Sequence, residues 1–352
     1  MTESIGVIKL PISRLHMELT NICDFSCEFC PDSRMRRQRG TMSFEMAKSI
    51  IDDISRTRIA RLLLFHVMGE PALHPHLVDI AEYAHAKHVD VCITTNGSRM
   101  KGDLLNALIK ANIKRMIVSL QTPDESTFSM RGARGLSFEE YAEHITSIAR
   151  TFIQKGGETE LTVSFLSSPL RKLIIPVAKE FSIADTSKKL REYLRIWAER
   201  ILRGTSIENR LSGVLKQINR VRSFKENKVV ITDKLSFHTR IVGDWATHFD
   251  SKIIEARFGY CCGIQENFGI LWDGAYTFCC ADYEGRTSTH NYRDTSIQDY
   301  LQKEVVQKVV KGFESFRVLH PHCRQCLGDK SMLNALVKQI GSIIYFKWIK
   351  QN

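Results

Sequence analysis

The stretch RLHMELTNICDFSCEFCP, from Arg14 to Pro31, joins an apolar run to three closely spaced cysteines. Cys23, Cys27 and Cys30 are separated by three and then two residues. Three thiolates leave one iron of a cubane iron–sulfur cluster without a protein ligand, much as a catalytic zinc site keeps one open position. Structural zinc sites usually take paired cysteines, or cysteine with histidine, so the spacing favours iron and sulfur over zinc.

Short apolar runs and amphipathic segments alternate through the first half of the chain, which predicts parallel strands joined by crossover helices. Strands are expected at Leu15–Thr20, Arg61–Val67, Val89–Thr95, Arg115–Gln121 and Glu160–Leu166. Helices are expected in SFEMAKSIIDDISR, HLVDIAEYAHAKH and KGDLLNALIKAN. This alternation indicates an α/β fold, with either a barrel-like or a doubly wound sheet. Loops after the strands form the active-site face of such folds, and the three-cysteine loop is one of them.

Composition divides the chain into three parts. Residues 1–245 hold the alternating segments, with a helical insertion at about 184–225. Residues 246–330 are rich in cysteine, glycine and aromatic residues, which predicts a small metal-stapled hairpin module. Residues 331–352 form an amphipathic tail with a basic-flanked apolar face, which either packs on its own domain or docks on a membrane surface or a partner.

The chain of 352 residues carries a net charge of +11. This basic excess permits an anionic substrate or partner surface, but no nucleic-acid-binding motif accompanies it, so we expect no nucleic acid partner. We find no secretory signal and no run of roughly 18 apolar residues, which predicts a cytoplasmic protein. Nine of the ten cysteines fall into two groups, and the lone Cys92 is interpreted as a small buried hydrophobic residue.

With Phe29 before its last cysteine, the three-cysteine loop resembles the C-x3-C-x-aromatic-C motif of the radical S-adenosylmethionine (SAM) enzymes. Three motifs at successive predicted strand ends are similar to further elements of that family. They are MGEP (Met68 to Pro71), TTNG (Thr94 to Gly97) and VSLQT (Val118 to Thr122). The resemblance covers about residues 10–245 and implies a partial (β/α)6 TIM-like barrel with parallel strands.

The resemblance also implies roles for single residues. Cys23, Cys27 and Cys30 would be catalytic, because they would hold a 4Fe-4S cluster whose open iron chelates SAM. Glu70 would hold the amino group of SAM, and Arg131, twelve residues after Ser119, would pair its carboxylate. The residues expected to bind the cofactor are Phe29, Gly69, Glu70, Asn96, Ser119 and Arg131.

Six cysteines in the last hundred residues resemble the SPASM or shorter twitch extension of this family, whose cysteines bind auxiliary 4Fe-4S clusters. The segment DGAYTFCCADYEG, from Asp273 to Gly285, carries most of this likeness. It implies a second, auxiliary 4Fe-4S cluster, with Cys262 and Cys280 as spare members of two adjacent pairs. The expected ligands are Cys261, Cys279, Cys323 and Cys326. A structural zinc site is the alternative for four cysteines that end in C-x2-C.

By the same resemblance, SAM would be reductively cleaved to a 5'-deoxyadenosyl radical that abstracts a substrate hydrogen. A fully ligated auxiliary cluster suits electron transfer, so we expect an oxidoreductase. Its substrate is expected to be a small hydroxylated molecule, such as a sugar, cyclitol or nucleotide-linked compound. Because the motif starts at Cys23, we expect no leader-binding domain of the kind that many peptide-modifying relatives carry ahead of the barrel.

Two alternatives stay open. One is a maturase of ribosomal (RiPP) peptides that takes its leader-binding domain from another chain. The other is a radical epimerase in which Cys280 or Cys262 returns a hydrogen atom. The expected partners are a small-molecule or peptide substrate and an electron donor such as flavodoxin or ferredoxin. Further candidates for substrate contact are His66, which either points into the barrel or is a structural histidine, and Asp282, near the auxiliary cysteines.

Overall fold

The computed structural model describes residues 4–155, 157–168, 182–243, 245, 248–250 and 252–349. Its strands β3 to β11 are Arg14–Met17, Leu63–Phe65, Val91–Thr95, Arg115–Gln121, Glu160–Ser167, Asn227–Val230, Leu235–Ile241, Asn267–Ile270 and Tyr276–Thr277. Within the described residues they form one nine-stranded sheet in the order β11-β10-β3-β4-β5-β6-β7-β9-β8. The seven strands from β10 to β9 are parallel, and the antiparallel β11 and β8 form the edges.

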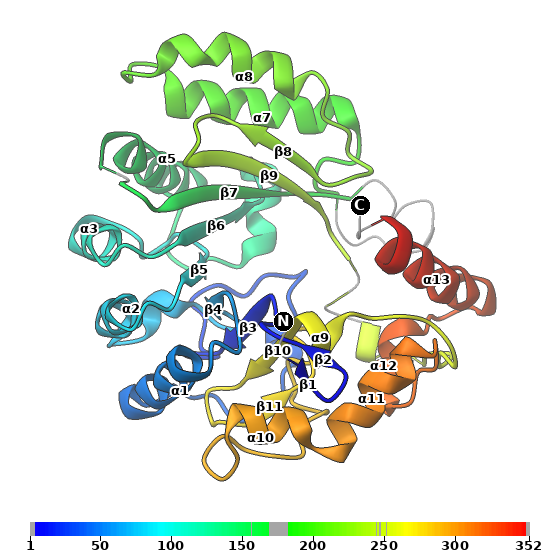
Figure 1. Cartoon of the computed structure of the whole chain (residues 1–352). Coiled ribbons are helices and arrows are strands. Elements are labelled where there is room, and N and C mark those ends of the chain that lie inside the picture. The colour runs from blue at the N-terminus through cyan, green and yellow to red at the C-terminus, as the bar shows by residue number, and fades with distance from the viewer. Residues whose placement is uncertain are drawn as a thin grey trace.

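Figure 1 shows the sheet curving like an open barrel with helices on its convex side. These are α1 (Phe44–Thr57), α2 (Leu77–Ala86), α3 (Gly102–Lys110), α5 (Phe138–Lys155), α7 (Ser187–Leu202) and α8 (Leu211–Ile218). Shorter elements are η1 (Pro31–Arg34), η2 (Pro71–Leu73), α4 (Glu125–Phe128), η3 (Ser129–Arg131), η4 (Glu208–Arg210) and η5 (His248–Asp250). The six parallel strands β3 to β7 and β9 are those of the expected partial (β/α)6 barrel.

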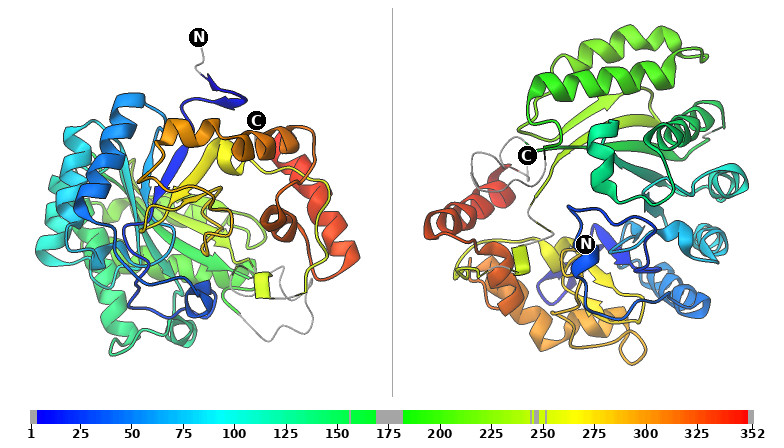
Figure 2. Two further views of the ribbon diagram at one scale, coloured as in Figure 1. Left: turned by 90° about the horizontal axis from the view of Figure 1, so that it is seen from below. Right: turned by 180° about the vertical axis from the view of Figure 1, so that it is seen from behind.

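The C-terminal part adds helices around one end of the sheet (Figure 2). They are α9 (Gly263–Glu266), α10 (Ile297–Gln302), α11 (Glu304–Glu314), α12 (Pro321–Leu327), α13 (Met332–Ile344) and η6 (Tyr345–Ile349). Strand β10 pairs in parallel with β3, with Phe268 opposite Leu15 and Ile270 opposite Met17. The barrel and the C-terminal part therefore share one sheet. A two-stranded hairpin, β1 (Ser4–Ile5) and β2 (Ile8–Lys9), precedes it.

Strand β6 shows how the sequence builds this layer. Met116, Val118 and Leu120 alternate along it and are fully buried, whereas Ile117 and Ser119 between them are only half-buried. Because strand side chains alternate between the two faces, the buried set packs under the helices and the other set faces the inside of the barrel.

The structure contains all five expected strands and all three quoted helices. The helical insertion expected at about 184–225 is present as α7 and the shorter α8. In the 246–330 part the expected hairpin is present as β10 and β11, but α10, α11 and α12 were not anticipated. The division at residue 245 stays a proposal, because β10 belongs to the second part but pairs with β3 in the sheet of the first part. Among the described residues, no helix is both long and apolar enough to span a bilayer.

Candidate active site

The three-cysteine loop follows the carboxyl end of β3, and the motifs after β4, β5 and β6 follow the neighbouring carboxyl ends. Its backbone is held against η3. The Ser26 N–H donates to Arg131 O at 3.1 Å, and the Glu28 N–H donates to Met130 O at 2.9 Å. Parallel strands end at the same edge of a sheet, so the topology brings the four sequence motifs together.

Cys23, Cys27 and Cys30 are free, half-buried thiols. Burial raises the pKa of all three thiols, that of Cys23 to about 12, while the charge of Arg131 partly offsets the rise at Cys27. A bound metal centre reverses this preference, because the thiolate is the ligand. Among the described residues, no three cysteine, histidine or acidic side chains converge closely enough to hold a single metal ion. A cubane takes thiolates that stand further apart, so this finding does not count against a cluster.

Arg131 lies buried beside these thiols and provides a test of whether the site fits an anionic cofactor. Burial lowers the pKa of its guanidinium, but the neighbouring Cys27 thiol raises it, and the net shift is upward. The guanidinium carbon lies 4.9 Å from the ring centre of Phe25 and 5.9 Å from that of Phe29, and Nη1 donates to Gln121 Oε1. Its Nε has no hydrogen-bond partner among the described residues. A buried cation with an unsatisfied N–H fits an anionic group such as the SAM carboxylate.

The MGEP motif packs against the entrance of the cysteine loop. Gly69 has φ +76°, and a Cβ there would lie 2.3 Å from Thr20 O, so only glycine fits. The Glu70 N–H donates to Ile22 O at 2.8 Å. Met68, which stands where the family has a further glycine, is buried and is not among the residues with positive φ. The methionine therefore does not strain this turn.

Glu70 joins the ends of β4 and β5. Its buried carboxylate accepts hydrogen bonds from Thr95 Oγ1 at 2.7 Å, Asn96 N at 2.6 Å and Ala72 N at 3.1 Å. Burial raises the pKa of Glu70 to about 7, against the opposing effect of these hydrogen bonds. A carboxylate has about four acceptor positions, so one remains for a further donor such as an ammonium group. Glu70 therefore organises the site whether or not it also contacts SAM.

Asn96 and Ser119 occupy different positions. Asn96 Nδ2 donates to Asp24 Oδ1 at 2.8 Å, and Asp24 also accepts from Ser98 Oγ at 2.8 Å and Arg99 Nε at 3.0 Å. Asn96 thus ties the cysteine loop to β5. Ser119 lies half-buried on the inner face of β6, where its side chain is accessible to a ligand. Contact of either residue with SAM stays a prediction.

The late cysteines gather into a second group. The thiols of Cys280, Cys261, Cys326 and Cys323 surround Cys279 and add to burial in raising its pKa. Helix α12 carries Cys323 and Cys326 on one face, and the Gly263 N–H donates to Cys261 Sγ at 3.3 Å. Because β11 runs antiparallel to β10, Cys279 lies toward the amino ends of the parallel strands, away from the three-cysteine loop. The expected ligand set is therefore brought together, and its ligation of a cluster stays a prediction.

The two spare thiols differ in their surroundings. Cys262 is buried in the hydrophobic core. Cys280 is half-buried, and the charges of Arg14 and Arg240 partly offset the rise that burial causes in its pKa. The thiol of Cys280 is therefore the one of the two that is influenced by cationic residues, one in β3 and one in β9.

Asp282 and His66 were the other candidates for substrate contact. The buried Asp282 carboxylate accepts from Arg286 N at 2.9 Å, and from Thr287 N and Oγ1 at 2.7 Å each, so it stabilises a turn. His66 follows β4 and is half-buried, and burial, together with the nearby His16, lowers its pKa to about 4. His66 is therefore neutral near pH 7.

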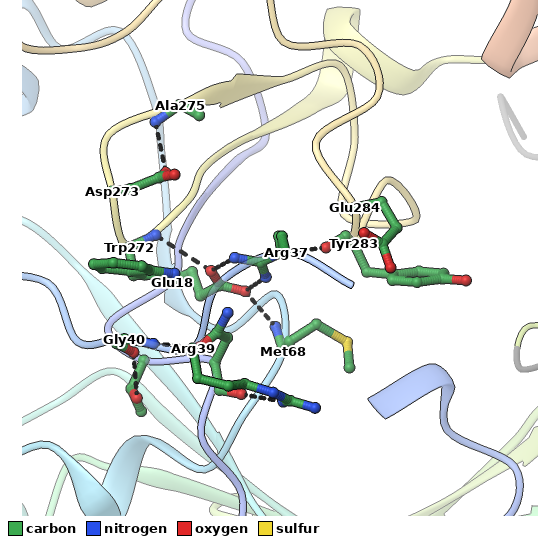
Figure 3. Close-up of polar contacts among 12 residues, drawn as sticks. Glu18, Arg37, Arg39, Gly40, Met68, Trp272, Asp273, Ala275, Tyr283 and Glu284 are labelled. Atoms are coloured by element: carbon green, nitrogen blue, oxygen red, sulfur yellow. Dashed lines mark hydrogen bonds and ion pairs between the residues drawn. The ribbon is translucent and has the colours of Figure 1, made fainter. Parts of the chain in front are cut away.

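Figure 3 shows a buried ion pair between residues on the two sides of the cysteine loop, Glu18 after β3 and Arg37 after η1, which also contacts the C-terminal part. Glu18, which is fully buried, accepts from both Nη atoms of Arg37, from Met68 N at 3.1 Å and from Trp272 N at 3.2 Å. The Arg37 Nε donates to Tyr283 O. Burial raises the pKa of Glu18, and Arg37 opposes that rise. One carboxylate therefore holds the backbone of MGEP, the segment after η1 that carries Arg37, and the β10–β11 turn.

Sequence reasoning missed Glu18, Arg37 and Asp24. An acidic residue inside the apolar run RLHMELT was an available signal for Glu18, since a buried charge is rare without a partner. No sequence signal connected it to Trp272, which is 254 residues away. Cys92, in contrast, is buried as interpreted, and burial raises the pKa of its thiol to about 11.

Comparisons with known proteins agree with this arrangement. Residues 17–162 match the radical SAM superfamily, and residues 261–327 match SPASM, an iron–sulfur cluster-binding domain. Mycofactocin maturase MftC of Mycobacterium tuberculosis (strain CDC 1551 / Oshkosh) is 32% identical over 109 residues, which is 30% of this chain and 27% of MftC. The chain thus spans only about 30% of the length of the first curated relatives that it matches.

Two solved structures have a similar fold. SuiB of Streptococcus suis bound to S-adenosylmethionine has a TM-score of 0.58 at 15% identity, covering 88% of this chain and 69% of SuiB. BtrN in complex with AdoMet and 2-DOIA has a TM-score of 0.51 at 13% identity, covering 90% of this chain and 89% of BtrN. The matched domains imply 4Fe-4S clusters and SAM as cofactors. The chain therefore carries a radical SAM domain followed, toward its C-terminus, by a SPASM iron–sulfur cluster-binding domain.

Proposed function

We propose that the chain is a radical SAM enzyme that oxidises a small hydroxylated molecule by two electrons. The observation that carries this proposal is the meeting of the three-cysteine loop with Glu70, Asn96 and the unsatisfied Nε of Arg131 at one end of the barrel. Four sequence motifs, spread over residues 23–122, converge there, as the assembly of one cofactor site requires.

Each group in this site has a task when the cofactors are bound. Cys23, Cys27 and Cys30 would hold the first cluster, and Arg131 would pair the carboxylate of SAM. Together the clusters and SAM supply a radical that removes a hydrogen atom from an unactivated carbon, and an acceptor for one electron. Phe25 lies over the Arg131 guanidinium and excludes water from it, which strengthens its interaction with an anion.

The second cysteine group supports oxidation over other outcomes. Its four expected ligands leave no open iron for SAM or substrate, so an electron-accepting role fits that site. Loss of one hydrogen atom, one electron and one proton converts a carbon-bound hydroxyl to a carbonyl. His66, neutral near pH 7, offers an acceptor for the hydroxyl hydrogen bond on the inner side of the barrel. The similarity to nearly all of BtrN, a structure solved with AdoMet and 2-DOIA, further supports a small-molecule substrate.

Iron content tests the cofactor assignment. Anaerobic reconstitution should give about eight irons per chain, and the triple variant Cys23→Ala, Cys27→Ala, Cys30→Ala should retain about half. The variant Cys92→Ala serves as the matched control and should keep the full iron content, because Cys92 is buried away from both groups. Recovery of zinc with little iron would contradict the proposal.

Product analysis tests the reaction. Reduced enzyme should release 5'-deoxyadenosine from SAM, and only the protein with all three loop cysteines should do so. With a panel of polyols deuterated at the hydroxyl-bearing carbon, we expect deuterium in 5'-deoxyadenosine and one carbonyl product per SAM consumed. SAM cleavage without any oxidised polyol would retain the radical assignment and reject the proposed substrate class.

A peptide maturase is the second candidate, favoured by two comparisons. MftC is by name a mycofactocin maturase, and SuiB has been solved bound to its precursor peptide SuiA. Crosslinking, epimerisation or oxidation of a residue in a short peptide, detected by mass spectrometry after SAM cleavage, would establish this function. The same enzyme preparation would then leave the polyol panel unchanged.

An epimerase is the third candidate, and the position of Cys280 makes it testable. Cys280 lies near Arg14 and Arg240, whereas Cys262 is in the core. An epimerase that uses Cys280 should place solvent deuterium on the product carbon, and Cys280→Ala should abolish that incorporation. Cys262→Ala is the matched control and should leave it intact.

A further inference from the structure

Helix α13 presents an apolar face to solvent. Six large apolar side chains of α13, and that of Tyr345 directly after the helix, have exposed fractions of 42–71%. This face, termed the α13 face below, comprises Met332, Leu333, Leu336, Val337, Ile340, Ile344 and Tyr345. Residues with this spacing lie along one side of a helix. Figure 1 shows α13 at the periphery of the molecule.

The opposite side of α13 holds the helix to the protein through polar contacts. Gln339 Oε1 accepts from the Arg257 N–H at 3.1 Å and from the Phe258 N–H at 3.3 Å. Ser342 Oγ accepts from the Tyr260 N–H at 3.0 Å. The buried residues of α13 are the small Ala335 and the polar Gln339, and Ile343 packs partly against the core, whereas most large apolar side chains of the helix lie outward. Such a face is retained when something apolar covers it.

The segments packed beside α13 extend this surface and give it a charge. The backbones of Ile254 and Asp329, and of Phe258 and Arg317, form isolated antiparallel β-bridges, and the side chains of Ile254 and Phe258 are partly exposed. Across residues 252–258, 314–317 and 329–347 there are six lysines and arginines and three acidic residues. None of the seven residues of the α13 face is charged. The surface is thus apolar with a cationic surround.

We propose that the α13 face docks on an anionic lipid surface and holds the enzyme at a membrane. An apolar helix face with cationic residues beside it inserts into the boundary between headgroups and acyl chains, and the cations attract anionic lipid. At 13 residues, α13 is about 20 Å long and lies in the plane of the membrane, because a spanning helix needs about 20 apolar residues.

Charge favours this occupant over a second copy of the chain. Two chains that paired through the α13 face would bring their cationic surrounds together, on proteins that each carry a net charge of +11. Like charges at an interface oppose association, whereas an anionic bilayer attracts the same residues. The proposal is independent of the reaction, because no residue of the α13 face belongs to the candidate active site.

Vesicle binding of the full chain tests this proposal. We expect at least about tenfold stronger cosedimentation with vesicles containing about 30 mol% phosphatidylglycerol than with phosphatidylcholine alone, and weaker binding as salt rises. The double variant Leu333→Asp, Val337→Asp should bind at least about tenfold more weakly, because it places charge in the apolar face. Iron content and SAM cleavage should match those of the unmodified chain, which shows that the variant folds.

A matched control and a mass measurement complete the experiment. Ile196 and Phe224 are exposed by 53% and 58% outside the α13 face, so Ile196→Asp with Phe224→Asp should leave vesicle binding unchanged. Equal binding of both double variants would overturn the proposal. A concentration-dependent dimer by light scattering that Leu333→Asp, Val337→Asp dissociates, without vesicle binding by the unmodified chain, would overturn it in favour of self-association.

Discussion

At the scale of single residues, buried charges determine how the site is held. Glu18 and Arg37 are 0% and 12% exposed in their side chains, so solvent can replace little of what each loses with its partner. Breaking a buried ion pair by removing one member usually costs more than removing both, because the remaining charge stays unpaired. The pair is therefore best examined with a double-mutant cycle.

We predict that Arg37→Met lowers the free energy of unfolding by about 3–5 kcal/mol, because the Glu18 carboxylate remains buried without its cation. The double variant Glu18→Gln, Arg37→Met should be more stable than Arg37→Met alone. Urea unfolding of the metal-free chain measures both values. Lys48→Met removes a pair in which Glu45 is 80% exposed and should cost less than about 1 kcal/mol. If Arg37→Met lost less than about 1 kcal/mol, as expected for Lys48→Met, the assigned role of the buried pair would be contradicted.

His16 gives the protein a predicted pH dependence. Burial and the charge of Arg14 lower the pKa of His16 to about 4, although its Nδ1–H donates to His66 O at 2.9 Å. In the unfolded chain, the His16 side chain takes up a proton near pH 6.5, whereas in the folded protein it stays neutral down to about pH 4. The folded state therefore keeps its full stability above pH 6.5 and loses part of it as the pH falls toward 4. This loss should amount to about 3 kcal/mol in the metal-free chain.

The variant His16→Asn should show a correspondingly smaller loss of stability between pH 6.5 and 4 by urea unfolding, since asparagine cannot take up that proton. His85 is exposed, so His85→Asn is the matched control and should follow the unmodified chain. If His16→Asn lost as much free energy of unfolding between pH 6.5 and 4 as the unmodified chain, His16 would not be the titrating group.

At the scale of elements, the loops at the strand ends are fixed by backbone contacts that allow few substitutions. The MGEP turn crosses the entrance of the cysteine loop so closely that Gly69 has no room for a side chain. The cysteine loop is in turn paired with η3 through Ser26 and Glu28. These contacts place the cofactor residues, so a small displacement here is expected to affect activity strongly.

We predict that Gly69→Ala lowers 5'-deoxyadenosine formation from SAM at least about tenfold, because its Cβ would displace the backbone at Thr20. Gly102→Ala is the matched control. Gly102 also has a positive φ, of +57°, but no atom lies within 4 Å of the added Cβ, so the cost should be about 1 kcal/mol of stability with activity kept. Similar activity in the two variants would contradict the role of the close approach.

At the scale of the whole molecule, the shared sheet makes the two parts cooperative. Strand β10 lies between β11 and β3, and the Glu18 N–H donates to Ile270 O at 2.9 Å. Opening β10 therefore exposes the edge of β3, which begins the barrel. Two parts joined in this way should not unfold separately.

Hydrogen exchange under native conditions tests this cooperativity. We predict that amides of Phe268 to Ile270 and of Leu15 to Met17 open with free energies within about 1 kcal/mol of each other. Exchange at β10 that is faster by several orders of magnitude would show independent unfolding. The β1–β2 hairpin has only two residues in each strand and should exchange fastest.

The amino-acid sequence by itself determined the strand and helix pattern of the first 245 residues, because the periodicity of apolar and polar residues reports which faces are buried. It also predicted the ligand types and their spacing, since Cys23, Cys27 and Cys30 lie within one loop and their relation is local. The same holds for Cys323 and Cys326, which share a helical turn.

Only the tertiary structure decided how these local pieces meet. The parallel pairing of β10 with β3, the Glu18 contacts with Arg37 and Trp272, and the different surroundings of Cys262 and Cys280 all depend on residues distant in sequence. The outward apolar face of α13 was equally undecided, since an amphipathic pattern does not say which side packs. The physical reason is the same in each case. Packing and charge compensation depend on which chain segments come together in space, and periodicity along one segment carries no information on its partner.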